Sequence, residues 1–295
     1  MTVLDYESRR QKREHRRRRI RRHGRRAYVR SVYFLPSLAT LGNAVCGFGA
    51  MYVSSLADTA LVIKDPWTAW WARHAFMYAA YLIFIAMIFD ALDGRLARLT
   101  RHTTDFGGQL DSLADAVSFG AAPAFIALQL FHFEVPNAHV ALSRLIWAIG
   151  ALYFCCAAIR LARFNVSNEH GEQHHFSFLG LPSPGAAGAV AAWILMQQDL
   201  RKMGVHTLAN IALFVLPVIV LSTGLLMVSE IRYPHVVNRY MRGKRSFGLL
   251  LAVVALLLLL VVWHEYTLAI GTVVYAFYGF VLWGMGRIRR AKPAI

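Results

Sequence analysis

The chain has 295 residues, of which 57% are hydrophobic and only 16% are charged, and its mean hydropathy is positive. Apolar runs of about twenty residues recur along it, and each could cross about 30 Å of hydrocarbon as a helix. A soluble core does not need eight such runs, which excludes an ordinary soluble globular protein. We therefore expect an all-α polytopic membrane protein, because helices satisfy their own backbone hydrogen bonds in lipid.

The predicted transmembrane helices number about eight, and the chain charge is distributed unevenly around them. With the N-terminus inside, 27 of the 32 Lys and Arg residues face the cytoplasm, as the positive-inside rule requires. We expect a multi-pass protein of the cell (inner) membrane with both termini and the functional site in the cytoplasm. The N-terminal segment is too long and basic for a signal-peptide n-region, so no cleaved signal is expected. The predicted spans are residues 34–56, 75–98, 108–131, 143–165, 182–199, 207–229, 247–264 and 267–286.

Three regions are predicted along the chain. Residues 1–33 form a basic cytoplasmic tail, residues 34–230 a core of six membrane helices, and residues 231–295 a basic loop, two C-terminal helices and a basic tail. We expect the N-terminal tail to be attracted to the anionic head groups of the bilayer. Binding of RNA or ribosomes is the alternative, but the usual aromatic platforms are missing, and we expect no nucleic-acid partner. The last two spans are expected to serve packing or dimerisation, and a homodimer is expected.

The first predicted span carries a stripe of small and polar residues on one helical face. Thr40, Asn43, Gly47 and Ala50 recur at i, i+3, i+7 and i+10. Such a stripe commonly packs closely against a neighbouring membrane helix. A buried Asn also needs a polar partner, and a ligand phosphate or base would serve. Both interpretations remain open from the spacing.

The stretch from Asp90 to Asp115 holds five of the sixteen acidic residues of the chain. Asp90 and Asp93 fall on one face at the end of the second predicted span, and Asp111 and Asp115 on one face at the start of the third. A short loop near residues 100–106 would make these helices antiparallel neighbours. We therefore expect four carboxylates to converge at the cytoplasmic membrane boundary.

Four like charges at short range repel one another, and two divalent cations would neutralise them. Ligation by oxygen atoms alone favours hard ions, and we expect two Mg²⁺ or Mn²⁺ ions. Two such ions are the usual apparatus for displacement at phosphorus. The alternatives are polar residues that only hold two helices together, and the permeation site of a divalent-cation transporter. The transporter site would lie near the bilayer midplane in broken helices.

This stretch resembles the signature of the CDP-alcohol phosphotransferase family, D-x2-D-G-x2-A-R-x8-G-x3-D-x3-D. The resemblance implies a metal site formed by the four aspartates, in which Asp115 is also the catalytic base. It further implies that other residues bind the CDP moiety. The fixed positions are Asp90, Asp93, Gly94, Ala97, Arg98, Gly107, Asp111 and Asp115, and the implied nucleotide-binding residues are Gly94, Ala97, Arg98, Gly107, Thr40 and Asn43.

Further segments are similar to the phosphatidylserine synthase subfamily of that family. They are the start of the first span, R-L-A-R-F-N at 160–165, F-L-G-L-P-S-P-G-A-A at 178–187 and L-M-V-S-E-I-R-Y-P at 226–234. The resemblance implies transfer of a phosphatidyl group from CDP-diacylglycerol to L-serine. Another alcohol, such as glycerol 3-phosphate, inositol phosphate or choline, is the alternative acceptor.

Arg160 and Arg163 are the candidate acceptor-binding residues. They stand at i and i+3 at the cytoplasmic end of the fourth predicted span. Because free serine carries a carboxylate, two guanidinium groups could form its clamp. The alternative is that both arginines only anchor the helix on the positive side of the membrane.

Overall fold

The computed structural model describes the chain in separate ranges, from residue 37 to residue 291. Within them, only the backbone is described for 97–100, 105, 167–169, 177–179, 232–234 and 279–291. The expected basic tail (1–33), most of the predicted seventh span and the loop at 170–176 lie outside the described residues. The described ranges are 37–58, 67, 70–71, 74–100, 105–169, 177–234, 258–260 and 262–291.

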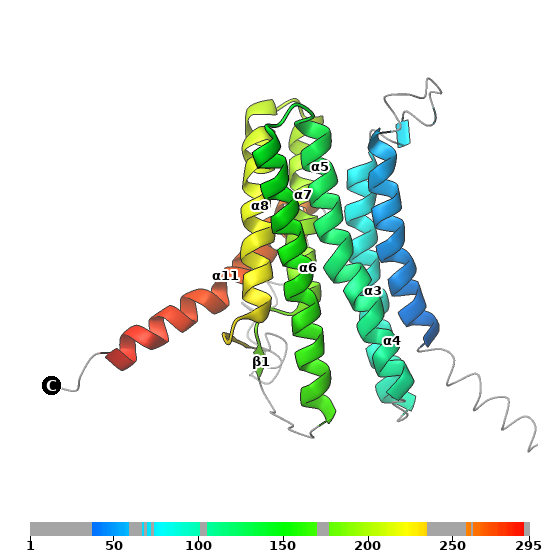
Figure 1. The fold of residues 1–295 in the computed structure, drawn as a ribbon, viewed down its shortest axis with the longest axis vertical. Coiled ribbons are helices and arrows are strands. Elements are labelled where there is room, and N and C mark those ends of the chain that lie inside the picture. The colour runs from blue at the N-terminus through cyan, green and yellow to red at the C-terminus, as the bar shows by residue number, and fades with distance from the viewer. Residues whose placement is uncertain are drawn as a thin grey trace, which may run out of the picture.

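The described part of the chain is a bundle of long helices, which confirms the expected all-α class (Figure 1). Two three-residue strands, which the sequence did not predict, are the only other regular elements in this part. The elements are a helix at 37–58, α3 (Ala75–Thr100), α4 (Asp105–Asp115), η1 (Ala116–Ala121), α5 (Ala122–Glu134), α6 (Val140–Glu169), β1 (Ser177–Leu179), α7 (Ser183–Lys202), α8 (His206–Val228), β2 (Arg232–Pro234) and α11 (His264–Ala291).

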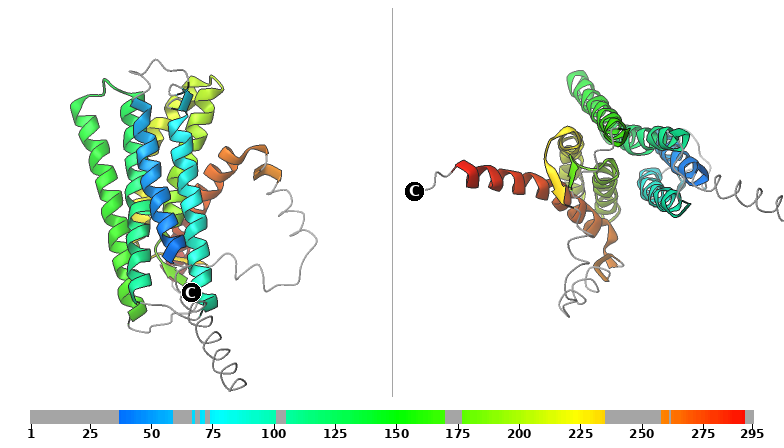
Figure 2. Two further views of the ribbon diagram at one scale, coloured as in Figure 1. Left: turned by 90° about the vertical axis from the view of Figure 1, so that its right-hand side faces the viewer. Right: turned by 90° about the horizontal axis from the view of Figure 1, so that it is seen from below.

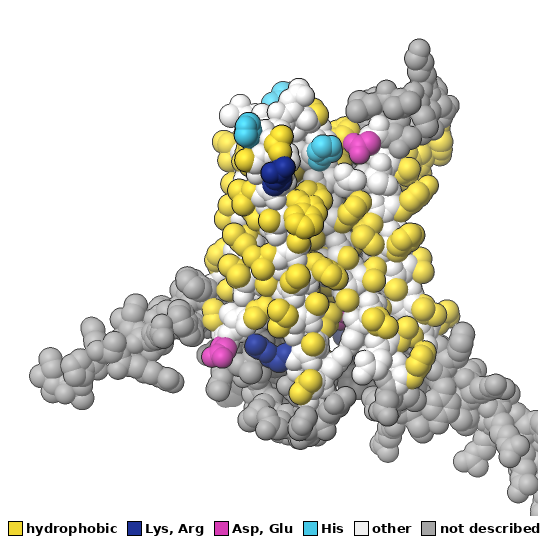
Figure 3. Space-filling model, viewed as in Figure 1, with side chains coloured by type: hydrophobic (Ala, Val, Ile, Leu, Met, Phe, Trp, Pro, Cys, Tyr) yellow, Lys and Arg dark blue, Asp and Glu magenta, His cyan; other side chains and the backbone are white. Residues whose placement is uncertain are grey.

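Four described helical segments are long and apolar enough to cross a bilayer. On the face drawn in Figure 3, hydrophobic side chains cover the middle of the bundle, and charged and histidine side chains lie towards its two ends. This distribution matches a protein whose sides contact lipid and whose ends contact water. The chain is therefore a multi-pass membrane protein. The four segments are Ala75–Leu96, Phe106–Glu134, Val140–Val166 and His206–Val228.

The third predicted span is one continuous helical rod made of α4, η1 and α5. Its middle section, η1, is a π-helix that begins directly after Asp115. The wider turn leaves a backbone carbonyl available, and the Tyr153 hydroxyl donates to the Phe119 carbonyl at 3.1 Å. α5 follows η1 directly and has Pro123 in its first turn, where the missing N–H of proline costs least. π-helical turns are frequent at functional sites.

Small residues let the core helices approach closely. Ala79 and Ala80 of α3 and Ala186 and Ala187 of α7 are fully buried, and α3 packs against α7. On α8, a Cβ added to Gly224 would lie 3.2 Å from the Tyr153 Cα of α6. Close packing of this kind is a main driving force for helix association in lipid, because the surrounding lipid tails are as apolar as the helix surfaces.

A strand pair closes the end of the bundle at which α4 begins. β1 precedes α7 and pairs antiparallel with β2, which follows α8. Gly180 lies between β1 and α7 with φ of +79°, and its N–H donates to the Ile231 carbonyl at 2.9 Å. Gly180 therefore supplies the left-handed backbone that the turn into α7 requires, and α7 starts directly after Pro182.

The C-terminal helix α11 differs in direction from the rest of the bundle. It packs against α7, but it runs obliquely to the other helices and its last turns extend away from them (Figures 1 and 2). It covers the whole of the predicted eighth span, 267–286. It is not among the four segments named above, so the expected number of eight spans is not established by the described residues.

Candidate active site

The paired helices α3 and α4 bring three of the predicted carboxylates to one point. α3 runs to the end of the bundle at which α4 begins, and the α4–η1–α5 rod returns in the opposite direction (Figures 1 and 2). Asp90, Asp93 and Asp111 each offer a carboxylate oxygen within 4.8 Å of the other two. The predicted convergence of the two helical faces is therefore confirmed for these three residues.

Asp115 lies outside that group of three and is held by the first described helix. Asn43 Nδ2 donates a hydrogen bond to Asp115 Oδ1 at 3.0 Å, and both side chains are buried. The carboxylate still lies within electrostatic range of the other three aspartates. Thr40, one turn before Asn43, makes a side-chain hydrogen bond with Asp93. The two residues expected at the nucleotide thus contact the aspartates in this structure.

The small and polar stripe on residues 37–58 packs against η1, so the packing interpretation of this stripe is confirmed. The Ser118 hydroxyl donates to the Asn43 carbonyl at 2.8 Å. A Cβ added to Gly47 would lie 2.5 Å from the Ser118 Cα, and Ala50 is fully buried. Only a glycine allows this approach. The contact fixes the height of Asn43 opposite Asp115.

The three grouped aspartates fit the ligand set of a hard divalent cation. Asp93 Oδ2 and Asp111 Oδ1 are buried and have no hydrogen-bond partner among the described residues. Buried carboxylate oxygens without donors are costly, and a bound cation would compensate them. Since all available donor atoms are oxygens, the site matches Mg²⁺ or Mn²⁺ better than Zn²⁺.

The glycine positions of the signature leave space beside the aspartates. A Cβ added to Gly94 would meet no heavy atom within 4 Å among the described residues. Gly107 lies in the first turn of α4 and is half-buried. Ala97 and Arg98 belong to the last turns of α3, but their side chains lie outside the described residues. The structure therefore bears on two of these four predicted positions.

Of the two candidate acceptor-binding arginines, Arg160 is the one that lies at the site. It interacts electrostatically with Asp115 and Asp90, and its Nη1 donates to the Ser183 hydroxyl at 2.7 Å. Its Nε is buried and has no hydrogen-bond partner among the described residues. Arg163 is exposed and donates to the Val228 carbonyl at the end of α8, at 3.4 Å. The two guanidinium groups therefore face different surroundings.

The three later segments that are similar to phosphatidylserine synthases meet at this end of the bundle. Arg160 contacts Ser183 of the second segment, and the Leu181 N–H donates to the Leu226 carbonyl of the third at 2.9 Å. The β1–β2 pairing extends the same contact between the second and third segments. Three segments within residues 160–234 thus form one unit around Arg160.

Several site residues were not predicted from the sequence. The Ser112 hydroxyl and the Asn165 amide are hydrogen-bonded at 2.9–3.0 Å, which joins α4 to the end of α6. Asn165 belongs to the R-L-A-R-F-N segment, so its place in that segment was the available signal. Ser183 likewise lies in the F-L-G-L-P-S-P-G-A-A segment at 178–187, so its place in that segment was the available signal. The π-helical turn at η1 has no sequence signal known to us.

Comparisons with known proteins identify the family of the chain. The sequence model of the CDP-alcohol phosphatidyltransferase family matches residues 33–218. The CDP-diacylglycerol–serine O-phosphatidyltransferase of Helicobacter pylori (strain 26695) is 31% identical over 255 residues, which cover 86% of this chain and 93% of that protein.

Two archaeal proteins are also similar. The CDP-diacylglycerol–serine O-phosphatidyltransferase of Methanocaldococcus jannaschii is 34% identical over 201 residues, which cover 68% of this chain and 81% of that protein. The archaetidylserine synthase of Methanothermobacter thermautotrophicus is 30% identical over 210 residues, covering 70% and 72%. The signature residues Asp90, Asp93, Asp111 and Asp115 all lie within the matched family region. The chain therefore belongs to the CDP-alcohol phosphatidyltransferase family.

Proposed function

We propose that this protein transfers the phosphatidyl group of CDP-diacylglycerol to the hydroxyl of L-serine and releases CMP and phosphatidylserine. The observation that carries the proposal is the group of three carboxylates within 4.8 Å, with Asp115 one turn beyond Asp111 on the same helix. The names of the similar proteins support the donor and acceptor. The enzyme would thus serve phospholipid biosynthesis.

The reaction is a displacement at the phosphorus atom that carries the diacylglycerol. The serine hydroxyl oxygen forms a new bond to this phosphorus, and the bond to the bridging oxygen of the diphosphate breaks, so that CMP leaves with that oxygen. Asp115 takes the hydroxyl proton. A carboxylate is a weak base, so positioning must supply much of the rate enhancement. The hydrogen bond from Asn43 holds this carboxylate in place.

Two divalent cations, Mg²⁺ or Mn²⁺, belong to the proposal as cofactors. Asp90, Asp93 and Asp111 would hold them, with Asp115 as a further ligand of one. When bound, they would stabilise negative charge on the diphosphate and on the departing CMP. The buried, unpaired oxygens of Asp93 and Asp111 support this assignment.

The substrate-binding residues follow from the same arrangement. We assign the cytidine and diphosphate to Gly94, Ala97, Arg98 and Gly107, with Thr40 and Asn43 at the edge of the nucleotide site. Open space beside Gly94 supports this placement. Arg160, with Arg163 further out, would receive the serine carboxylate. The buried Nε of Arg160 supports its role, because an anion would supply the missing acceptor.

The membrane arrangement in this proposal is the one expected from the charge distribution. It comprises eight spans in the cell inner membrane, a cytoplasmic site and termini, a catalytic core at residues 34–230, contacts with anionic head groups and a homodimer. The 27 inside-facing cationic residues support the orientation. Labelling of single cysteines introduced at residues 5 and 203 from each side of sealed vesicles tests it, and cross-linking in membranes tests the dimer.

The test of the activity offers purified protein CDP-diacylglycerol with serine, glycerol 3-phosphate, inositol phosphate or choline. CMP and the lipid product are both measured. Serine is expected to be preferred. A clear preference for another of these alcohols would leave the transferase class intact and overturn the acceptor, whereas no CMP release with any of them would overturn the class.

The test of the base replaces Asp115 with Asn. We expect turnover to fall by at least about a hundredfold, since general-base catalysis contributes about 10²–10⁴. Asn keeps the size of the side chain and can still face Asn43, so folding is expected to be retained. If the Asp115→Asn protein keeps a substantial fraction of wild-type turnover, another residue is the base.

A further inference from the structure

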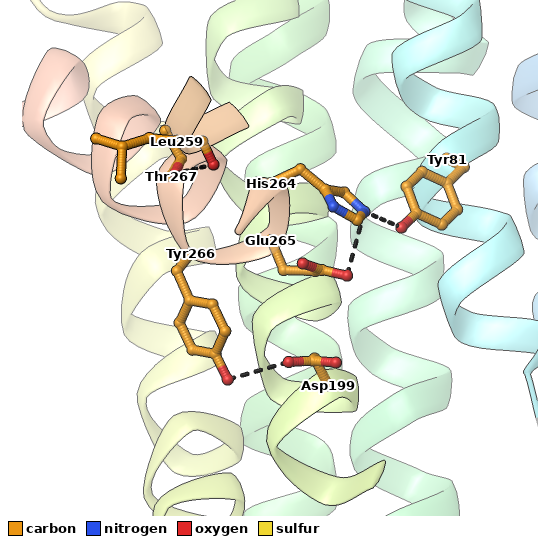
Figure 4. A network of polar contacts seen from close by, with 7 residues as sticks. All are labelled: Tyr81, Asp199, Leu259, His264, Glu265, Tyr266 and Thr267. Carbon is orange, nitrogen blue, oxygen red and sulfur yellow. Dashed lines mark hydrogen bonds and ion pairs between the residues drawn. The ribbon is translucent and has the colours of Figure 1, made fainter. Parts of the chain in front are cut away.

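The C-terminal helix α11, which lies beyond the region matched by the family, is held on the core by specific polar contacts. The Tyr81 hydroxyl of α3 and His264 Nε2 are hydrogen-bonded at 2.6 Å, and the Tyr266 hydroxyl donates to Asp199 Oδ2 of α7 at 3.1 Å (Figure 4). His264 also pairs with Glu265 at 3.1 Å. Two hydrogen bonds to different helices fix both the position and the rotation of α11.

Further along α11, Tyr275 reaches the start of α7. Its ring lies against Gly185, because a Cβ added to this glycine would be 3.5 Å from the Tyr275 Cε1. Gly185 is two residues beyond Ser183, whose hydroxyl accepts the hydrogen bond from Arg160. Tyr275 and Arg160 lie within electrostatic range of each other. A residue of α7 and a residue of α11 therefore lie near the guanidinium group that α6 carries.

The position of Arg160 gives this contact a chemical meaning. The guanidinium donates to the Ser183 hydroxyl at 2.7 Å and lies within electrostatic range of the carboxylates of Asp90 and Asp115. A guanidinium group presents its donors in a fixed plane, so its orientation decides which of them a ligand can meet. A side chain that restricts this orientation therefore affects how well a planar carboxylate is bound.

We infer that α11 completes the acceptor site, and that Tyr275 is a positioning residue which orients Arg160 towards the carboxylate of the acceptor. The inference rests on the proposed function and deepens it. The phenol acts through the guanidinium and does not take part in bond making.

The decisive variant is Tyr275→Phe, which removes the hydroxyl and keeps the ring against Gly185. We expect the KM for serine to rise about tenfold, which corresponds to about 1.4 kcal/mol of binding free energy, with the KM for CDP-diacylglycerol unchanged. The matched control is Tyr278→Phe, because Tyr278 lies on the same helix and is exposed. It should leave both constants unchanged.

A second readout separates orientation of Arg160 from simple packing. Ethanolamine lacks the carboxylate of serine but keeps its hydroxyl and amine. The rate of CMP release with ethanolamine should therefore be low and the same in wild type and in Tyr275→Phe. If Tyr275→Phe slows ethanolamine and serine equally, Tyr275 only supports the fold and the inference is overturned. An unchanged KM for serine in Tyr275→Phe overturns it as well.

The same experiment distinguishes failure of the inference from failure of the proposed function. Wild-type protein that gives no CMP with serine overturns the proposed function, and the role of Tyr275 in serine binding falls with it. Wild-type turnover of serine together with an unaltered Tyr275→Phe overturns the inference alone. A selective rise in the KM for serine supports both.

Discussion

Asn43 Nδ2 lies 3.0 Å from Asp115 Oδ1, and this hydrogen bond joins two helices across 72 residues of sequence. It connects the first described helix to the α4–η1–α5 rod, which carries two of the four signature aspartates, Asp111 and Asp115. Because Ser118 on the same rod donates to the Asn43 carbonyl, the asparagine is held on both its backbone and its side chain. The first helix therefore orients the residue that we propose as the base.

The first prediction concerns this hydrogen bond. Asn43→Ala leaves a buried carboxylate oxygen without its donor, which costs about 1–3 kcal/mol. We expect turnover with serine to fall about tenfold or more and the Tm in detergent to decrease. The control is Ser55→Ala on the same helix, which removes only an exposed bond to the Tyr52 carbonyl. Equal effects of the two substitutions would contradict the role of Asn43.

The second prediction concerns the cations. Removal of divalent ions with a chelator should abolish CMP release, and added Mg²⁺ or Mn²⁺ should restore it. Asp111→Asn removes one ligand charge, so we expect the Mg²⁺ concentration for half-maximal activity to rise about tenfold or more. The measurement is initial rate against free Mg²⁺. Full activity of wild-type protein in excess chelator would exclude the metal-assisted mechanism.

The third prediction concerns the contact between the first described helix and η1. Gly47→Ala places a methyl group 2.4 Å from the Ser118 Oγ and 2.5 Å from its Cα, so the helices must separate. Overpacking of this kind costs about 1–3 kcal/mol. Gly49→Ala on the same helix meets only Leu82 Cδ1 at 3.7 Å, which is ordinary contact.

The measurements for this pair are Tm and turnover in detergent. Gly47→Ala should lower both, since it also displaces Asn43 from Asp115, whereas Gly49→Ala should change neither by much. A Gly47→Ala protein with the Tm and the turnover of wild type would show that the two helices tolerate a larger separation than the site geometry implies.

The fourth prediction concerns the turn before α7. Gly180→Ala introduces a side chain at a φ of +79° and brings its Cβ 2.3 Å from the Met227 carbonyl oxygen. Gly204→Ala provides the control, because its φ is +78° with no heavy atom within 4 Å among the described residues. Both substitutions carry the backbone strain of about 1–2 kcal/mol, and only the first adds a clash.

Thermal unfolding is the measurement for this second pair. We expect Gly180→Ala to lower the Tm by clearly more than Gly204→Ala. The difference between the two reports the contact between the start of α7 and the end of α8. Similar Tm values for both would mean that this contact contributes little to stability.

Much of the architecture follows from the sequence, because in lipid a helix has few alternatives. The apolar runs predicted α3, α5, α6 and α8, and the spacing of Asp90, Asp93 and Asp111 predicted their common location. These features depend on local periodicity, which one sequence displays. The family resemblance added the roles of individual positions.

Other features depend on contacts between distant segments, and periodicity does not reveal these. The partner of Asn43 depends on the height of one helix against another, and this height is set by Gly47 and Ser118. The π-helical turn after Asp115 rotates the following helical residues relative to those before it. Apolar residues occur on both sides of this turn, so hydropathy does not reveal it. The oblique path of α11 likewise depends on polar contacts at His264 and Tyr266 that hydropathy does not register.

The pairing of β1 with β2 has a consequence for where this protein can be cut. The match to the family model ends at residue 218, yet the backbone carbonyls that receive the Gly180 and Leu181 amides belong to Ile231 and Leu226. A protein shortened to residue 218 would leave those amides without these acceptors. The smallest autonomous unit therefore extends at least to residue 234, beyond the end of the family-model match.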